Sequence, residues 1–380
     1  MGRVAEPFLG DVWGAIVGGA WFESGASSTD LSLLGPVCKT SGMRQRIRFC
    51  ATPAGRVAYS VMGAGPVLLC DTGWVSHLEH MLEIESVRTF FAALAERFSV
   101  VRFDKVGSGL SDRTNGDLTF DGQVTTLVAL ADHLDAERFH LFGASQGGQV
   151  VAAVAALQPE RTTSLAVYGM CARGADLAPE KVRASLVSLV RAHWGLGSQV
   201  MAAIFQPDPT PDEVRVLAEF QRWASTSDTA ADLLAEYYQT DVSSLLPTIK
   251  APTLVLHRED DKATGFGLGR EVASLIPTAT LIPLHGNAHL FWMGDWQAVL
   301  AAVLDFGPEP AMSAPVRLSS REVEVAALVA EGLTNQQIGQ RLFIAPRTAE
   351  THVENIRQKL GFRSRAQVAV WVAEQRIGKT

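Results

Sequence analysis

The chain has 380 residues, of which 47% are hydrophobic and 19% are charged. This length allows two or three domains with a large core, and no apolar run reaches the roughly 18–20 residues needed to cross a membrane. The composition therefore excludes a membrane-spanning protein and is typical of a soluble one. Four scattered cysteines without metal-ligand spacing indicate reduced thiols in a cytoplasmic protein, and they predict neither a metal site nor a cofactor.

The charge is divided unevenly along the chain. Residues 317–380 carry 10 Lys and Arg against 6 Asp and Glu, a net charge of +4. The other 316 residues carry 23 against 34, a net charge of −11. Because a polyanion attracts basic surfaces, we expect only the C-terminal segment to meet one.

Residues 1–42 are rich in Gly, Ala and Ser and lack periodicity, so we interpret them as a disordered segment or an extension, with Met43 as an alternative translation start. Short apolar runs and helical stretches alternate from there to residue 306. This alternation predicts a mostly parallel sheet with helices on both faces, an α/β fold. The expected strands are 46–51, 56–62, 66–71, 99–104, 139–143, 163–168, 252–257 and 279–284, and the expected helices are 87–97, 121–134, 149–157, 268–275 and 295–306.

Residues 175–245 interrupt the alternation with four helical segments, which we interpret as a helical cap inserted into the sheet domain. An apolar stripe runs through this segment at Trp194, Ile204, Phe205, Phe220, Trp223, Leu233 and Tyr237. Large apolar side chains from the cap and the sheet are expected to line a pocket beneath it. The candidates are Trp74, Met170, Trp194, Phe205, Trp223, Phe266 and Trp292.

A Gly-x-Ser-x-Gly sequence follows the fifth expected strand. It reads Gly143-Ala-Ser145-Gln-Gly147, and a stretch of helical composition comes next. Strand, tight turn and helix form the context of a nucleophile elbow, in which small neighbours keep the serine clear of adjacent backbone. The motif also arises by chance in ordinary turns, so its meaning depends on the rest of the chain.

A serine hydroxyl becomes a nucleophile when a base accepts its proton and a carboxylate orients that base. In a hydrolase of this architecture the three follow in the order serine, acid, histidine. The loop after strand 252–257 offers Glu259, Asp260 and Asp261, and the loop after the last strand offers His285 and His289. All three elements occur in order and in the appropriate loops, which indicates a serine hydrolase site.

Residues 43–306 resemble α/β-hydrolases almost throughout. The matching segments are Phe103–Asp112, Gly143–Gly148 and Pro252–Asp261. The resemblance implies a triad of Ser145, Asp261 and His289. Arg258 replaces the usual glycine of the acid loop, so Asp260 stays open as the alternative acid.

In the same resemblance, the backbone N–H groups of Trp74 and Gln146 form the oxyanion hole. Thr72 takes the place of the more usual histidine before Gly73, a change that backbone donors tolerate. His77 and His80 follow this loop at a spacing of three residues but lack a third metal ligand, so we expect them to pack rather than to bind a metal.

Three prolines between residues 307 and 316 indicate a linker, and residues 317–380 are typical of four short helices. Ser319 and Thr334 are expected N-caps, and Pro346 is expected in the first turn of the third helix. That third helix has an apolar face and a polar, partly basic face. Together with the short helix before it, it has the dimensions of a helix-turn-helix whose second helix enters the major groove.

The whole C-terminal segment resembles the LuxR-type helix-turn-helix domain. The matching segments are Leu318–Val325, Glu331–Ile338, Arg347–Val353, Lys359–Gly361 and Arg363–Arg365. The resemblance implies a homodimer on an inverted-repeat operator. It also implies base contacts from Glu350, Thr351, Glu354 and Asn355. Phosphate contacts are implied for Arg347, Arg357, Lys359 and Arg365. The expected DNA-binding residues are Arg347, Thr348, Glu350, Thr351, Glu354, Asn355, Arg357, Lys359 and Arg365.

Three functional hypotheses follow from this organisation. In the first, a LuxR-family transcriptional regulator uses its hydrolase-like domain to sense, and in addition to hydrolyse, a small and largely apolar ligand. In the second, an active serine esterase or lactonase carries a DNA-binding tail. In the third, the hydrolase fold serves only for dimerisation. The complete set of triad residues disfavours the third, and the C-terminal domain disfavours a plain metabolic enzyme, so the first is preferred.

Overall fold

A computed structural model of the chain describes residues 45–114, 116–307, 318–360, 364–365, 367–369 and 371–372. The expected N-terminal segment 1–42, the start at Met43 and nearly all of the linker 307–316 lie outside these residues. No helix in the described ranges is both long and apolar enough to span a bilayer.

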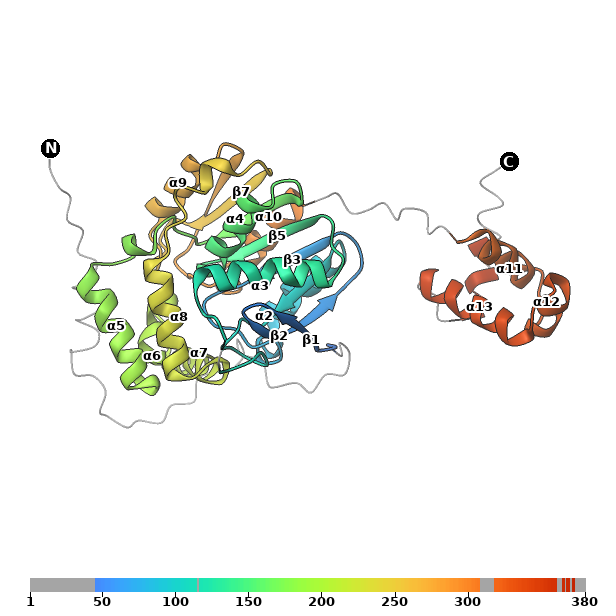
Figure 1. Cartoon of the computed structure of the whole chain (residues 1–380), viewed down its shortest axis with the longest axis horizontal. Coiled ribbons are helices and arrows are strands. Elements are labelled where there is room, and N and C mark those ends of the chain that lie inside the picture. The colour runs from blue at the N-terminus through green and yellow to red at the C-terminus, as the bar shows by residue number, and fades with distance from the viewer. Residues whose placement is uncertain are drawn as a thin grey trace. The chain divides into compact units, whose positions relative to one another are not determined.

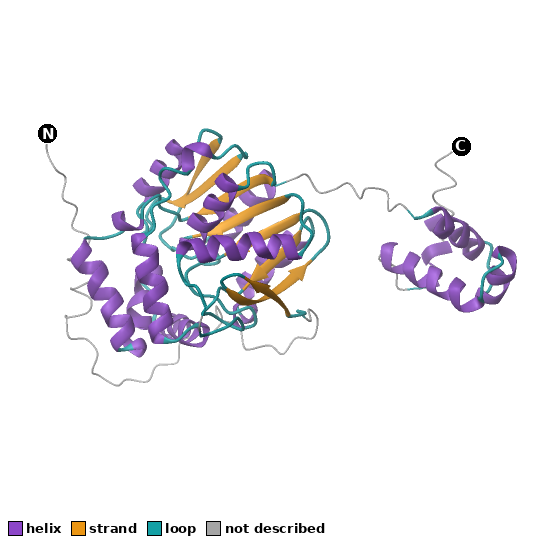
Figure 2. Ribbon diagram, viewed as in Figure 1, coloured by secondary structure: helices purple, strands orange, loops and turns teal. Residues whose placement is uncertain are grey.

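An eight-stranded sheet forms the first folded part of the chain (Figures 1 and 2), in the order β1-β2-β4-β3-β5-β6-β7-β8. The hairpin strands β1 and β2 are antiparallel to each other, β2 is antiparallel to β4, and all other neighbours are parallel. The α/β fold with a mostly parallel sheet is therefore confirmed. The strands are β1 Arg48–Thr52, β2 Gly55–Met62, β3 Val67–Asp71, β4 Ser99–Phe103, β5 Phe139–Ala144, β6 Thr162–Tyr168, β7 Thr253–Arg258 and β8 Ala279–Leu284.

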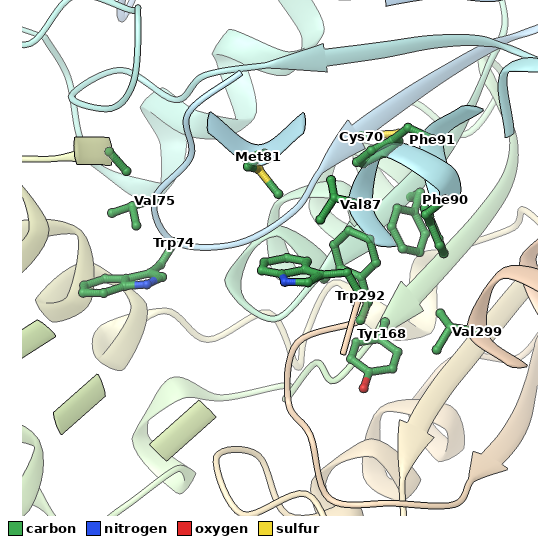
Figure 3. Close-up of a cluster of buried hydrophobic side chains, with 14 of the residues drawn as sticks. Cys70, Trp74, Val75, Met81, Val87, Phe90, Phe91, Tyr168, Trp292 and Val299 are labelled. Carbon is green, nitrogen blue, oxygen red and sulfur yellow. The ribbon is translucent and has the colours of Figure 1, made fainter. Parts of the chain in front are cut away.

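Helices cover both faces of the sheet, as the alternation predicts. On one face α2 (Glu85–Ala95) and α10 (Trp296–Phe306) pack into an aromatic-rich cluster that includes Tyr168 and Trp292 (Figure 3). On the other face α3 (Phe120–His133), α4 (Gln146–Leu157) and α9 (Phe266–Leu275) contribute to a second, mainly aliphatic cluster. The carboxyl ends of the parallel strands meet at one edge of the sheet, which is where ligand sites of such folds lie.

The cap consists of four helices, as expected. They are α5 Glu180–Ala192, α6 Trp194–Phe205, α7 Pro211–Ala224 and α8 Ser227–Gln239. Helix α7 starts with a complete capping box between Thr210 and Glu213 and has a proline in its first turn. Its inward face carries Leu217, Phe220 and Gln221.

The expected position of Trp223 in the apolar stripe is wrong. This side chain is 49% exposed, whereas Gln221 is 1% exposed. Each helical residue turns the direction of the side chain by about 100°, so Leu217, Phe220, Gln221 and Ala224 share a face that excludes Trp223. Hydrophobicity alone predicted the wrong face of the helix, because the buried position holds the amide of Gln221 and the exposed position holds the indole of Trp223.

The second folded part is a small helical unit with α11 Ser320–Ala330, α12 Asn335–Leu342 and α13 Pro346–Leu360. Ser319 and Thr334 each form a capping box, as the sequence predicts. The residues expected for a fourth helix are helical where they are described, at 365, 367–369 and 371–372. Val325, Ile338 and Ile356 join the helices in one buried cluster.

Candidate functional site

Ser145 occupies the turn between β5 and α4 with φ of 54° and ψ of −125°. Positive φ is strained for a residue with a side chain, so the surrounding structure must hold the turn. The Ser145 N–H donates to the carbonyl of Tyr168 at 2.8 Å. A Cβ on Gly147 would lie 2.2 Å from the carbonyl oxygen of Asp71, and one on Gly143 would lie 2.6 Å from that of Gly147. Both glycines are therefore sterically required.

Three side chains from distant parts of the sequence form one hydrogen-bonded chain. His289 Nε2 lies 2.8 Å from Ser145 Oγ, and His289 Nδ1 lies 2.8 Å from Asp261 Oδ2. Asp261 and His289 are both buried. The backbone N–H of His289 donates to the carbonyl of Phe205 at 2.9 Å, and the two rings stack, so the cap contacts the histidine directly. This is the arrangement that a nucleophilic serine needs.

The acid loop fixes Asp261 as an anion. Its Oδ1 accepts the N–H groups of Ala263 at 2.9 Å and Thr264 at 3.0 Å. Burial by itself raises the pKa of this carboxyl, but the positive charge and the hydrogen bond of His289 outweigh burial, and the pKa is lowered. The side chain of the alternative acid, Asp260, is exposed instead. His285 is exposed and pairs with Glu259 at 2.9 Å.

Arg258 connects the acid loop to the histidine loop. Its side chain is buried and donates to the hydroxyl of Tyr168 at 2.7 Å, to the carbonyl of His285 at 3.2 Å and to that of Met293 at 2.6 Å. Tyr168 in turn donates to the carbonyl of Ala288, the residue before the histidine of the site. The residue that departs from the usual glycine thus supports the geometry of the loop.

The expected oxyanion donors lie on both sides of Ser145. Gln146 is the first residue of α4, where a helix leaves its N–H groups without internal acceptors. Trp74 follows Gly73, whose φ of 149° turns the loop after β3. Both loops rest on a buried ion pair of Lys105 Nζ and Asp71 Oδ2 at 3.0 Å. Lys105 also donates to the side chain of Gln146 at 3.5 Å.

Burial drives both members of this ion pair toward their neutral forms. It raises the pKa of Asp71 and lowers that of Lys105, and their mutual attraction opposes both shifts. The pair was not identified from the sequence. Asp71 is the last residue of β3 and Lys105 follows β4, and only the placement of β3 beside β4 brings them together.

A cavity of about 30 Å³ lies above Ser145, between the sheet and the cap. Of the aromatic side chains expected there, Trp74, Phe205 and Trp292 line it. Trp194 packs edge-on against Trp74, while Met170 lies beneath the elbow and Phe266 packs against His257. The cavity is lined by Thr72, Gly73, Trp74, Val75, Ala144, Ser145, Phe205, Leu217, Phe220, Gln221, His289, Leu290, Phe291 and Trp292.

Tyr237 was expected only as an apolar residue of the cap. The structure instead places its buried hydroxyl 3.7 Å from Cys171 Sγ, and Ser145 is among the groups that influence its pKa. Burial raises the pKa of the phenol well above its ordinary value, and the influence of Ser145 opposes the rise only in part. The phenol therefore keeps its proton beside the nucleophile.

The segment Phe103–Asp112 holds neighbouring loops and the cap in place through hydrogen bonds. Asp104 accepts hydrogen bonds from Ser76 Oγ at 2.8 Å and from the N–H groups of Leu78 and Leu110. A Cβ on Gly109 would lie 2.0 Å from the Asp104 carboxylate, which requires glycine there. The segment also holds the end of α7, because the Gly109 N–H donates to the carbonyl of Ala224.

His77 and His80 pack, as predicted, with ring centroids 4.2 Å apart. The exposed Trp223 covers the second ring, with centroids 4.4 Å apart. Within the described ranges no group of three His, Cys, Asp or Glu side chains could hold a metal ion.

Helix α13 presents most of the expected DNA-binding residues on its exposed side. Ala349, Val353 and Ile356 are buried against the other helices, as the amphipathic pattern predicts. The expected residues with exposed side chains are Arg347, Thr348, Glu350, Thr351, Glu354 and Asn355. Arg357 is half-buried and pairs with Glu354 at 2.8 Å, and the side chain of Lys359 lies outside the described part of the structure.

Arg365, which the resemblance predicts to contact a phosphate, makes hydrogen bonds within its own domain. Its guanidinium donates to Asn335 Oδ1 at 2.7 Å and to the carbonyl of Leu333, and partial burial lowers its pKa. The side chain thereby holds the start of α12. Sequence alone could not reveal this role, because the partners precede it by some thirty residues.

The two folded parts match two separate families. The family described as alpha/beta hydrolase fold matches residues 66–295. The family described as bacterial regulatory proteins, luxR family, matches residues 316–372. Both resemblances noted in the sequence are thus confirmed.

Individual relatives of the first part are hydrolases. RutD from a Caulobacter species, assigned as a carbamate hydrolase, is 29% identical over 230 residues, which are 57% of this chain and 85% of that protein. A hydrolase from Pseudomonas aeruginosa has a TM-score of 0.60 at 27% identity and covers 68% of this chain and 97% of its own. An enol-lactonase from Burkholderia xenovorans, at 23% identity and a TM-score of 0.59, shares the fold.

The C-terminal part is similar to a segment of bacterial regulatory proteins. LiaR from Bacillus subtilis is 48% identical over 54 residues, which are 14% of this chain and 26% of that protein. NarL from Escherichia coli is 39% identical over 61 residues, 16% of this chain and 28% of that protein. The match to these regulators covers about a quarter of their length. The chain belongs to the α/β-hydrolase fold family and carries a C-terminal DNA-binding domain of the luxR family of bacterial regulatory proteins.

Proposed function

We propose that this protein is a transcriptional regulator that binds, and hydrolyses, a small and largely apolar carbonyl compound in its hydrolase-fold domain. One observation carries the proposal: a hydrogen-bonded Ser145, His289 and Asp261 at an apolar cavity occurs on the same chain as a helix-turn-helix with an exposed polar recognition helix. Because the same chain carries a DNA-binding domain, ligand binding can alter transcription. A metabolic enzyme without such a domain lacks this route.

The ligand class follows from the site. A serine activated by histidine attacks an electrophilic carbonyl, and nearby N–H groups stabilise the oxyanion that forms. Esters, lactones and carbamates share this chemistry, and the names of two similar hydrolases point to a lactone and a carbamate. The aromatic and aliphatic walls favour an apolar substituent on that carbonyl.

The DNA partner follows from the family of the C-terminal domain. We propose that α13 enters the major groove, that Glu350, Thr351, Glu354 and Asn355 face base edges, and that Arg347, Arg357 and Lys359 meet phosphates. We further propose a cytoplasmic homodimer on an inverted repeat, because paired recognition helices read paired half-sites. In such a dimer a ligand that changes the hydrolase domain can change how the two helices engage DNA.

Gel-shift titration of the full chain on its own upstream DNA, at low salt, tests the regulatory part. We expect a specific complex that Arg347→Ala weakens. Failure of the wild type to shift any fragment of this region contradicts the regulator.

Labelling of Ser145 by a fluorophosphonate tests the chemical part. The wild type should react and Ser145→Ala should not, with Ser185→Ala as a control because Ser185 is an exposed cap residue outside the cavity. Absence of labelling in the wild type counts against hydrolysis. If a reporter responds to the ligand equally in the wild type and in Ser145→Ala, hydrolysis is not part of the signal.

A further inference from the structure

Gln221 lines the cavity and is buried, and its side chain has an unmet hydrogen-bonding requirement. Its side chain is 1% exposed, and its Oε1 has no hydrogen-bond partner among the described residues. Several other buried polar atoms in the described ranges also lack partners, but of the residues that bear them Gln221 alone lines the cavity above Ser145. A buried acceptor without a donor has lost its hydrogen bonds to water without replacement, so this position is unfavourable unless something supplies a donor.

The orientation of the amide is set by its neighbours. The nitrogen Nε2 donates to the carbonyl of Ser198 at 3.0 Å and to that of Leu217 at 3.2 Å. Because carbonyls only accept, the nitrogen must occupy this place, and a flipped amide would set oxygen against oxygen. Both N–H bonds are thereby used, and Oε1 is left as an acceptor that the protein does not satisfy.

Apart from the two carbonyls that its nitrogen contacts, most side chains that line the cavity around Gln221 are apolar. Leu217 and Phe220 from the same helix line the cavity with it, as do Trp74 and Phe205. An apolar residue at this helical position would pack against them without an unmet polar atom. The amide is therefore best explained by a contact with the occupant of the cavity.

Building on the function proposed above, we propose that Gln221 determines ligand specificity by accepting a hydrogen bond from a hydroxyl or N–H group of the ligand. The ligand is then a small carbonyl compound with two polar groups. Its carbonyl carbon faces Ser145, and a hydroxyl or amide N–H on the apolar part faces the cap. A purely hydrocarbon substituent displaces any water from Oε1 and leaves the acceptor buried and unpaired.

The size of the cavity adds a further condition. A volume of about 30 Å³ accommodates one or two water molecules rather than a ligand of several heavy atoms. Helices α6 and α7 supply the cap side of this space, so they must move outward when the ligand enters. The donor–acceptor contact with Gln221 then links the ligand directly to the helix that moves.

Binding to full-length Ser145→Ala tests the inference without turnover. The probes are methyl butyrate, its 2-hydroxy and 3-hydroxy derivatives, and methyl N-formyl-2-aminobutyrate. Binding is followed by tryptophan fluorescence, since Trp74 and Trp292 line the cavity. We expect at least one donor-bearing ester to bind about 3–10-fold more tightly than methyl butyrate, the ratio that one neutral hydrogen bond provides.

Adding Gln221→Met removes the acceptor and keeps the length of the side chain, so the ratio should fall to about one. Adding Gln206→Met is the matched control, because this cap glutamine lies outside the cavity and should leave the ratio unchanged. The inference is overturned if methyl butyrate binds the Ser145→Ala parent as tightly as the donor-bearing esters, or more tightly. It is also overturned if the preference for a donor-bearing ester survives Gln221→Met, or if none of the four esters binds. The proposed DNA-binding function is tested independently, by the gel-shift titration.

Discussion

At Arg258 the chain carries a buried guanidinium where its resemblance to other α/β-hydrolases leads one to expect glycine. A buried cation is unfavourable unless its donors are satisfied, and here one hydroxyl and two carbonyls accept from it. These acceptors belong to β6 and to the segment around the histidine of the site. We therefore propose that Arg258 positions the loop that carries His289.

Arg258→Met should slow fluorophosphonate labelling of Ser145 by roughly 10–100-fold, because loosening the histidine loop misplaces the base. The matched control is Arg270→Met, which removes an exposed arginine of the neighbouring α9. Labelling rates across pH separate a displaced base from general unfolding, with the melting temperature measured alongside. Equal rates for the two variants contradict the positioning role.

The ion pair of Lys105 and Asp71 allows a prediction about the free energy of unfolding. Their side chains are 4% and 2% exposed, so Lys105→Met leaves a buried carboxylate unpaired and should cost about 3–5 kcal/mol. Lys250→Met breaks the exposed pair with Glu160, whose side chains are 71% and 88% exposed, and should cost at most about 1 kcal/mol. Urea unfolding measures both, and similar costs contradict the prediction.

His77 makes stability depend on pH. Burial, then His80 and Arg113, lower its pKa to about 4 in the folded protein, while an unfolded histidine has about 6.5. As pH falls through this window the unfolded chain binds the proton first, so folding loses about 1–2 kcal/mol between pH 7 and pH 5. His77→Gln should lose less over the same interval in urea unfolding, and an equal loss in both proteins speaks against this assignment.

At the scale of elements, the helices of the C-terminal domain assign different tasks to two arginines that the sequence suggested were alike. Arg347 is exposed at the start of α13, whereas Arg365 is bonded to the beginning of α12. An exposed cation near a recognition helix can neutralise a phosphate. One that is bonded within the domain contributes to its fold instead.

Arg347→Met should weaken DNA binding and reduce the slope of log affinity against log salt by about 1, since one phosphate contact is lost. Arg365→Met should lower the melting temperature of the helical domain and leave the salt slope unchanged. Gel shifts at several salt concentrations, with thermal unfolding beside them, compare the two. A reduced salt slope in Arg365→Met restores the phosphate role for that residue.

At the scale of the whole molecule, the proposed regulator requires that occupation of one domain alters the action of the other. A fluorophosphonate adduct on Ser145 fills the cavity covalently and so mimics a bound ligand. We expect the labelled protein to differ from the unlabelled protein several-fold in affinity for its operator, a coupling of about 1 kcal/mol or more. Identical affinities would falsify coupling between the two domains.

The sequence by itself determined the order and type of nearly every element, because period, caps and turn residues are local properties. It also determined the candidates Ser145, Asp261 and His289, since their order along the chain and their place at strand ends are readable without coordinates. The capped helices at the start of the C-terminal domain were readable for the same reason.

Tertiary structure alone decided the features that depend on which segments become neighbours. It selected Asp261 over Asp260, gave Arg258 its three acceptors, paired Lys105 with Asp71, and turned Arg365 inward. It also placed Gln221 rather than Trp223 at the inner face of α7, because two positions along a helix turn a side chain to nearly the opposite side. Contacts between residues far apart in the chain leave no local pattern, and it is these contacts that shape the site.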